Sequence, residues 1–218
     1  MNSQAEPRTG DCAPVGALLD GVPGTALLAN GRSVDIAVAA PADLARVRTF
    51  YERLSDTATY SRFFAIRRAV PDKELKSVVA QDIPHHVTLL ASIDNELIGL
   101  GEFVMSDKPD EAEVAFAVAD DHHREGVATL LLERLAVVAR RCGLKQLVAQ
   151  TLPGNCDMLL VFRTVGLAEQ ARIDGGVVYV TLDLSTLDHL EAEAEIRHQQ
   201  ALFYRRDHEQ RSDRALHE

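Results

Sequence analysis

The segment from Glu113 to Cys142 limits the fold of this chain more than any other part of the sequence. Apolar and small residues alternate along 113–118, a polar loop follows, and a helical pattern runs from Gly126 until Gly143 ends it. The apolar stripe of that helix consists of Val127, Leu131, Leu135 and Val138. A strand that leads through a short loop into an amphipathic helix predicts an α/β protein whose helix packs on a sheet.

The start of this helix has the properties of an anion site. The first N–H groups of a helix have no partner within the helix, and the positive end of its dipole lies there. Gly126 and Ala128 are small enough for phosphate oxygens to approach, while Arg124 adds a positive charge and Thr129 a hydroxyl. The pattern therefore predicts a place for a pyrophosphate. Any α/β protein contains several strand-loop-helix junctions, so a purely structural connection is the alternative interpretation.

Composition excludes several classes of protein. The 218 residues carry 23 Lys and Arg against 33 Asp and Glu, a net charge of −10 that argues against broad nucleic-acid binding. No apolar run approaches the ~20 residues that span a bilayer, and residues 1–25 lack the pattern of a secretory signal. Cys12, Cys142 and Cys156 have no CxxC spacing, so we expect reduced thiols and no metal site. We expect a cytoplasmic protein without membrane or nucleic-acid partners.

The chain divides into three parts. Residues 1–24 are rich in Gly and Pro and are expected to form a mobile leader. Residues 25–184 alternate hairpin and helix patterns, which predicts one α/β (α+β) domain with a mixed, mostly antiparallel sheet flanked by helices. Residues 185–218 predict an amphipathic helix and a charged tail, and the apolar stripe of that helix suggests a homodimer.

The strand before the loop presents two different faces. Val114, Phe116 and Val118 point to one face, which we expect to be core. The opposite face carries Glu113 and small residues, which leaves room for a ligand chain beside a carboxylate that could act as a general base. A solvated Glu113 on an exposed edge is the alternative. Glu102 is a second candidate base, although its neighbours Leu100 and Val104 suggest a rim position.

Three segments resemble the GNAT N-acetyltransferase superfamily. Ala112–Leu132 resembles its acetyl-CoA-binding core, and the signature Q/R-x-x-G-x-G/A reads here as the six residues from His123 to Ala128. Leu152–Leu167 is similar to the later helix of the family. Leu54–Phe64 is similar to the substrate-side helix of GNAT domains in bacterial protein-lysine acetyltransferases. The resemblance covers residues 26–184.

The resemblance implies an acetyl-CoA-dependent N-acetyltransferase that acetylates a primary amine, foremost a protein lysine. Glu113 would be the general base, and no covalent enzyme intermediate or metal would be needed. Main-chain groups of Phe116 and Val118 would pair with the pantetheine arm of acetyl-CoA, with Asn155 nearby. The pyrophosphate would be held by the segment that contains Arg124, Gly126, Val127, Ala128 and Thr129.

Three positions depart from the family pattern. His123 replaces the usual Gln or Arg, Glu125 brings a negative charge toward the expected phosphates, and Phe162 stands where many members place a tyrosine that protonates the leaving thiolate. These departures favour a non-catalytic module that binds CoA or acyl-CoA as an alternative. A small-molecule amine acetyltransferase is a further alternative, because the acidic composition suits a cationic small molecule equally well.

Overall fold

The computed structural model describes residues 14–28, 30–65, 67 and 69–187. The strands are β1 Gly24–Leu27, β2 Ser33–Val38, β3 His86–Ile93, β4 Glu96–Met105, β5 Glu111–Val118, β6 Gln146–Thr151, β7 Ala168–Asp174 and β8 Val177–Asp183. The α-helices are α1 Val15–Leu19, α2 Leu44–Arg53, α3 Asp56–Phe63, α4 Asp72–Val79, α5 Val127–Arg141 and α6 Cys156–Val165. Short 3₁₀ turns span Pro41–Asp43, Asp120–His122 and Leu184–Thr186.

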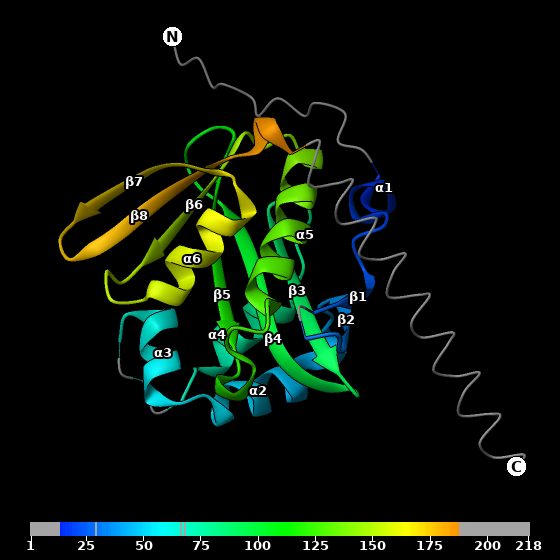
Figure 1. Cartoon of the computed structure of the whole chain (residues 1–218). Helices are drawn as coiled ribbons and strands as arrows, with labels where there is room; N and C mark the ends of the chain where they lie inside the picture. Colours follow the sequence, from blue (N-terminus) through cyan, green and yellow to red (C-terminus); the bar gives the residue numbers. More distant parts are fainter. Residues whose placement is uncertain (1–13, 29, 66, 68, 188–218) are drawn as a thin grey trace, which may run out of the picture.

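All the strands belong to one sheet with the order β1-β2-β3-β4-β5-β6-β8-β7. Neighbouring strands are antiparallel except for β5 and β6, which are parallel because α5 carries the chain back between them. Helices cover both faces of the sheet, with α5 and α6 on one side and α2 and α4 on the other (Figure 1). The predicted fold class, a mixed and mostly antiparallel sheet flanked by helices, is confirmed.

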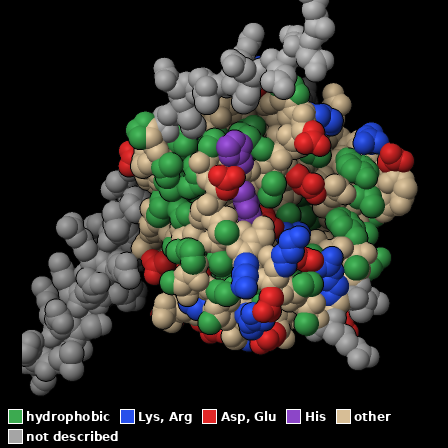
Figure 2. Space-filling model, turned by 180° about the vertical axis from the view of Figure 1, so that it is seen from behind, with side chains coloured by type: hydrophobic (Ala, Val, Ile, Leu, Met, Phe, Trp, Pro, Cys, Tyr) green, Lys and Arg blue, Asp and Glu red, His purple; other side chains and the backbone are tan. Residues whose placement is uncertain are grey.

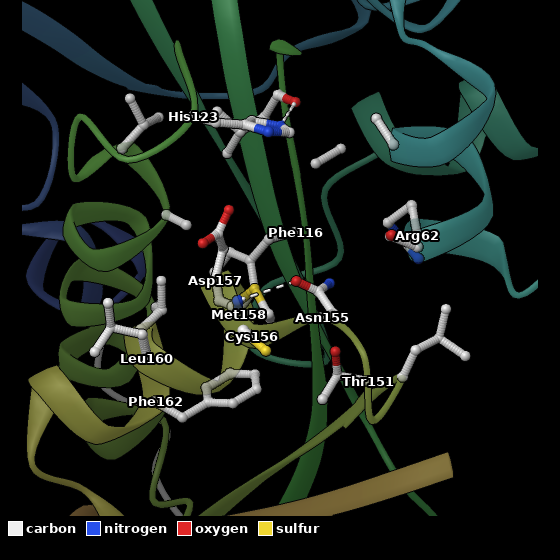
Figure 3. Close-up of a pocket in the computed structure, with 18 of the residues that line it drawn as sticks. Arg62, Phe116, His123, Thr151, Asn155, Cys156, Asp157, Met158, Leu160 and Phe162 are labelled. Atoms are coloured by element: carbon white, nitrogen blue, oxygen red, sulfur yellow. Dashed lines mark hydrogen bonds between the residues drawn. The ribbon is translucent and has the colours of Figure 1, made fainter. Parts of the chain in front are cut away.

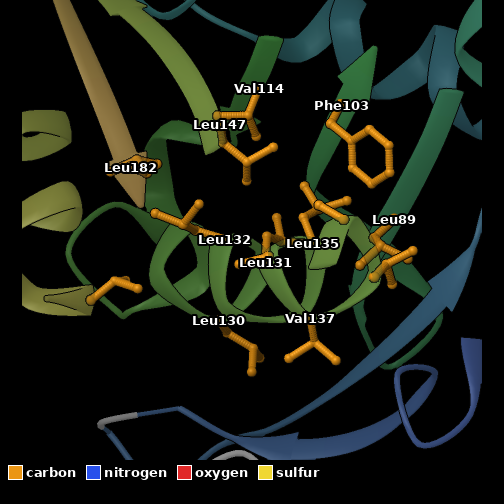
Figure 4. Packing of buried hydrophobic residues seen from close by; sticks show 14 of the residues in the cluster. Leu89, Phe103, Val114, Leu130, Leu131, Leu132, Leu135, Val137, Leu147 and Leu182 are labelled. Atoms are coloured by element: carbon orange, nitrogen blue, oxygen red, sulfur yellow. The ribbon is translucent and has the colours of Figure 1, made fainter. Parts of the chain in front are cut away.

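The larger core lies under α5. This helix buries Leu131 and Leu135 against strand residues such as Leu89, Phe103 and Val114 (Figure 4). Its opposite side is buried as well, since Leu130 and Val137 point away from the sheet. The second core lies between the sheet and the helices α2 and α4, and its fully buried side chains include Phe50, Leu75, Leu90 and Leu100. Burial on both faces fixes the sheet between two layers of helices.

Two glycines of β4 make room for neighbouring side chains, and one of them, Gly99, lets the start of α5 approach the sheet closely. A Cβ atom on Gly99 would lie 2.8 Å from Cγ1 of Val127, and one on Gly101 would lie 2.8 Å from Cδ1 of Phe116. Both distances are shorter than any van der Waals contact, so β4 must lack side chains at these positions. The first turn of α5 and the side chain of Phe116 occupy the space that results.

The strands β5 and β6 pair over only part of their length. Their parallel register runs from Glu111 and Gln146 to Val114 and Ala149. Beyond this point β5 continues along β4, and β6 continues along β8, where Thr151 faces Val178. The two strands therefore part, and one edge of β5 after Val114 faces none of the strands that the structure describes.

The expected leader ends earlier than the sequence suggested. Residues 14–24 form α1 and the start of β1, and the side chains of Leu18 and Val22 are buried. From α5, Arg134 and Arg141 donate hydrogen bonds to carbonyl oxygens of this segment. These contacts explain why a segment without sustained periodicity is nevertheless packed. Residues 1–13 lie outside the described residues, and so does the predicted tail 185–218, with its suggested homodimer surface, from residue 188 onward; its first two residues belong to the 3₁₀ turn Leu184–Thr186.

Charges of both signs are mixed on one face of the molecule. On the face seen in Figure 2, Lys and Arg side chains are interspersed with Asp and Glu side chains instead of forming one continuous basic patch. The described part of the chain contains no helix with the length and apolarity that a membrane span requires.

The close approach of α5 to β4 predicts the effect of adding one methyl group. The substitution Gly99→Ala should reduce the free energy of unfolding by about 1–3 kcal/mol, because Val127 is β-branched and cannot move aside within its helical turn. Gly16→Ala is the matched control, since a Cβ atom there would meet no atom within 4 Å. Denaturant unfolding of both variants measures the difference, and equal stabilities would show that α5 is not constrained by Gly99.

Candidate active site

The parting strands open onto a cavity of about 1040 Å³. Its walls come from α3, the free end of β5, the loop and first turn of α5, the end of β6, and α6 (Figure 3). The residues predicted from the sequence to bind a cofactor all line it: Phe116, Val118, Arg124, Gly126, Val127, Ala128, Thr129 and Asn155. Glu113, the predicted general base, is not among the lining residues.

The N-terminus of α5 has no side-chain cap. The residue before the helix, Gly126, has a φ of 93°, a left-handed conformation that glycine adopts without strain. Because glycine has no side chain, it cannot accept a hydrogen bond from the N–H groups of the first turn, and no other described side chain accepts one from them. The N–H groups of Val127, Ala128 and Thr129 are thus available at the cavity wall, together with the positive end of the helix dipole.

Glu125 does not point toward the predicted anion site. Its carboxylate accepts a hydrogen bond from Nδ1 of His122 at 2.8 Å and lies 3.9 Å from the guanidinium of Arg32. Glu125 is absent from the described lining of the cavity, so its charge faces away from the place where phosphates were expected. The neighbouring departure, His123, donates from Nε2 to the carbonyl oxygen of Val118 at 3.1 Å and thereby ties the loop to the end of β5.

The loop before α5 is also joined to α6. Nε of Arg124 donates to both carboxylate oxygens of Asp157, at 3.1 and 3.2 Å. In the first turn of the same helix, Oδ1 of Asn155 accepts a hydrogen bond from the main-chain N–H of Met158 at 3.1 Å. Asn155 is therefore the N-cap of α6, a structural role in addition to its place in the cavity wall.

Glu113 lies just outside the cavity and is solvent-exposed. Its Oε1 accepts a hydrogen bond from Nε2 of Gln150 at 3.2 Å, and Gln150 does line the cavity. The face that carries Glu113 is less bare than the sequence suggested, because Ala117 and Ala119 are buried in the core under α2 and α4. On this face Ala115, which is partly buried, and Ala117 still line the cavity.

Glu102 occupies a buried ionic cluster, so its expected rim position is wrong. Its carboxylate pairs with the guanidinium of Arg62 and accepts a hydrogen bond from Nε2 of His86 at 2.9 Å. Arg62 belongs to α3 and faces the cavity across from α6 (Figure 3). Burial raises the pKa of Glu102, but the hydrogen bond from His86 and the charge of Arg62 outweigh burial and hold that pKa below its ordinary value.

Sequence reasoning missed this cluster because its members are distant in the chain. Arg62 lies 40 residues from Glu102, and His86 lies 16 residues from it. The only local signal was a single acidic residue within an apolar strand. Phe162 is buried in the wall of the cavity and offers no polar atom there. The described residues contain no group of three or more His, Cys, Asp or Glu that could hold a metal ion.

An uncapped helix N-terminus beside two parting parallel strands defines an α/β domain with a candidate site for a phosphate-bearing ligand. The comparisons assign it more narrowly: residues 48–167 match the model of the Acetyltransferase (GNAT) family. The chain belongs to this family, which confirms the predicted family membership.

Two curated relatives are similar to this chain. Acetyltransferase Pat of Mycolicibacterium smegmatis is 34% identical over 85 residues, which are 39% of this chain and 25% of that protein. The chain thus matches only about a quarter of the length of Pat. Acetyltransferase PA5475 of Pseudomonas aeruginosa is 27% identical over 135 residues, which are 60% of this chain and 73% of that protein.

Solved structures agree with this assignment. The GNAT domain of S. lividans PAT is 32% identical, covers 75% of this chain and 98% of that chain, and superposes with a TM-score of 0.70. The protein yncA from Salmonella typhimurium, solved with acetyl-CoA, is 20% identical with a TM-score of 0.58, covering 70% of this chain and 95% of that one. The second likeness concerns the fold alone.

The pKa of Glu102 predicts how stability depends on pH. Because that pKa is lowered in the folded protein, the carboxylate contributes its full stabilisation above its ordinary value of 4.5 and loses it as the pH falls through the folded value. At neutral pH, Glu102→Gln should cost roughly 3–5 kcal/mol by leaving Arg62 without its partner. The difference in the free energy of unfolding between wild type and Glu102→Gln should shrink below pH 4.5.

Denaturant unfolding at a series of pH values measures this difference. The control is Glu96→Gln, which breaks the exposed ion pair with Arg53 and should cost less than about 1 kcal/mol. A difference between wild type and Glu102→Gln that stays constant down to acid pH would contradict the assigned ionisation.

Proposed function

We propose that this protein transfers the acetyl group of acetyl-CoA to the primary amine of a protein lysine in the cytoplasm, with Glu113 as the general base. The observation that supports this proposal most is the uncapped N-terminus of α5 at the wall of a cavity into which β5 and β6 part. Donors aligned at a helix terminus suit a diphosphate, and the unpaired edge of β5 suits the amides of a pantetheine arm.

The residues around the cavity fit CoA. The first turn of α5 presents small or half-buried side chains at Ala128 and Thr129, and the acidic Glu125 is held by His122 instead of facing the phosphates. Arg124 lies at the same wall, with Asp157 engaging its Nε. When bound, acetyl-CoA supplies an acyl carbon activated as a thioester. The described side chains would orient this acyl group and exclude water from one side of the gap between β5 and β6.

The acceptor amine would enter from the side of α3. There Glu102 neutralises the positive charge of Arg62. The cavity wall therefore does not repel a positively charged ammonium group. Glu113 would take the proton of the ammonium, directly or through a water molecule, and the free amine would then attack the thioester carbonyl. The resemblance of the α3 segment to bacterial protein-lysine acetyltransferases favours a lysine of a protein over a small amine.

A binding module without turnover is the second candidate. Two observations favour it: Glu113 lies outside the described lining of the cavity, and Phe162 supplies no proton donor to a leaving thiolate. Such a module would bind CoA and release no thiol with any amine. The two candidates share the cofactor site, so the two experiments that follow separate binding from turnover.

The cofactor site is tested by Ala128→Asp, which places a carboxylate at the first turn of α5. The affinity for acetyl-CoA should fall by about tenfold or more, because like charges repel where the diphosphate is expected. The helix itself should be no less stable, since an acidic residue at a helix N-terminus is favourable. Calorimetric titration measures the affinity, with Ala128→Ser as the neutral control. Unchanged affinity in Ala128→Asp would place CoA elsewhere.

The general base is tested by Glu113→Gln. Turnover should fall by roughly 100-fold or more, while the affinity for acetyl-CoA stays the same because Glu113 does not line the cavity. Release of CoA thiol with a panel of lysine peptides, polyamines and aminoglycosides measures turnover and identifies the acceptor class. Glu52→Gln, an exposed change on α2, is the control. Wild-type turnover in Glu113→Gln would show that another group removes the proton.

A further inference from the structure

Gln150 is the link between Glu113 and the cavity. The carboxylate of Glu113 is exposed and outside the lining, whereas Gln150 is partly buried and inside it. The hydrogen bond from Nε2 of Gln150 to Oε1 of Glu113, 3.2 Å long, joins the two side chains. A base that acts in the cavity from this position therefore acts beside the carboxamide of Gln150.

The strand register explains why these side chains meet. Glu113 pairs with Val148, so Gln150, two residues further on, is its diagonal neighbour on the same face of the sheet. The last pair of the two strands is Val114 with Ala149. Gln150 is thus the first residue of β6 beyond that pair, and it stands where the gap between the strands opens.

Charge fixes which way the carboxamide of Gln150 is turned. An ionised carboxylate only accepts hydrogen bonds, so Gln150 must donate to Glu113 through Nε2. Its Oε1 is then not bonded to Glu113, and it is a neutral acceptor on a side chain that lines the cavity. A neutral oxygen is suited to hold an amine, because it attracts an N–H group without taking the proton.

The surroundings of Glu113 leave its orientation to Gln150. On β4, Val104 is its direct partner and Glu102 is the next residue on the same face. The carboxylate of Glu102 is already engaged by Arg62 and His86. On β6, Val148 is apolar. Among the described residues, no Lys or Arg forms an ion pair with Glu113. The hydrogen bond from Gln150 is therefore the contact that orients its carboxylate.

We propose that Gln150 positions both reactants of the proton transfer: its Nε2 holds the carboxylate of Glu113 at the gap, and its Oε1 accepts a hydrogen bond from the acceptor amine. This inference rests on the proposed function. The ammonium gives one proton to Oε2 of Glu113, and the nitrogen lone pair forms the C–N bond. The C–S bond breaks, and the second nitrogen proton passes to the thiolate of CoA. The carboxamide gains and loses no proton.

The test uses Gln150→Leu, which removes the donor and the acceptor but keeps the side-chain size. We expect kcat/KM for the acceptor to fall about tenfold or more, while the affinity for acetyl-CoA changes less than about twofold. Gln170→Leu is the matched control, because it makes the same change at an exposed position of β7. An unchanged kcat/KM in a folded Gln150→Leu protein would overturn the inference.

A double-mutant cycle separates positioning from an independent effect. If Gln150 acts through Glu113, adding Gln150→Leu to Glu113→Gln should lower kcat by less than about twofold further. Effects that multiply would overturn the role of Gln150 as a positioning residue. A fall in turnover for Glu113→Gln with none for Gln150→Leu would leave the proposed function intact and reject only this inference.

A binding measurement covers the case in which no acceptor is acetylated. The probe is a bisubstrate analogue in which a lysine side chain is joined to CoA through an acetyl bridge. Wild type should bind this analogue more tightly than CoA. Gln150→Leu should bind the analogue about tenfold more weakly than wild type does, while its affinity for CoA stays unchanged. If wild type binds CoA but gains nothing from the lysine, both the inference and the acetyltransfer to lysine are rejected.

Discussion

The early end of the pairing between β5 and β6 is the constraint on which the site depends. Parallel strands normally satisfy each other along their full length, but here the register stops at Val114 and Ala149 because β6 follows β8 instead. The parting leaves main-chain groups of β5 without a strand partner and opens the cavity between α3, α5 and α6. A ligand with its own amides can satisfy those groups without any rearrangement of the sheet.

Two further features keep the gap in its shape. On one face, the absence of a side chain at Gly99 brings the first turn of α5 down onto β4, so its N–H groups lie at the mouth of the gap. On the other face, the buried cluster of Glu102, Arg62 and His86 ties α3 to the sheet. The walls that would contact the nucleotide and the acceptor are therefore fixed by separate interactions.

Much of this could be predicted from the sequence, because its causes are local. The alternation along β5 and the small residues around Gly126 predicted the strand and an anion site, and the resemblance to the GNAT family added Phe116, Val118 and Asn155, all of which line the cavity. What the sequence did not indicate depends on partners far apart in the chain. The burial of Glu102 follows from side chains on α3 and β3, and the bond between Glu113 and Gln150 follows from the register of a parallel pair.

Hydrogen–deuterium exchange of the full chain with and without acetyl-CoA tests the central claim most directly. The account predicts slower exchange of the amides at residues 115–118 and 124–129, the unpaired edge of β5 and the first turn of α5, with little change in α2 and α4. Saturating acetyl-CoA that protects neither segment, or that protects the helices on the other face instead, would contradict it.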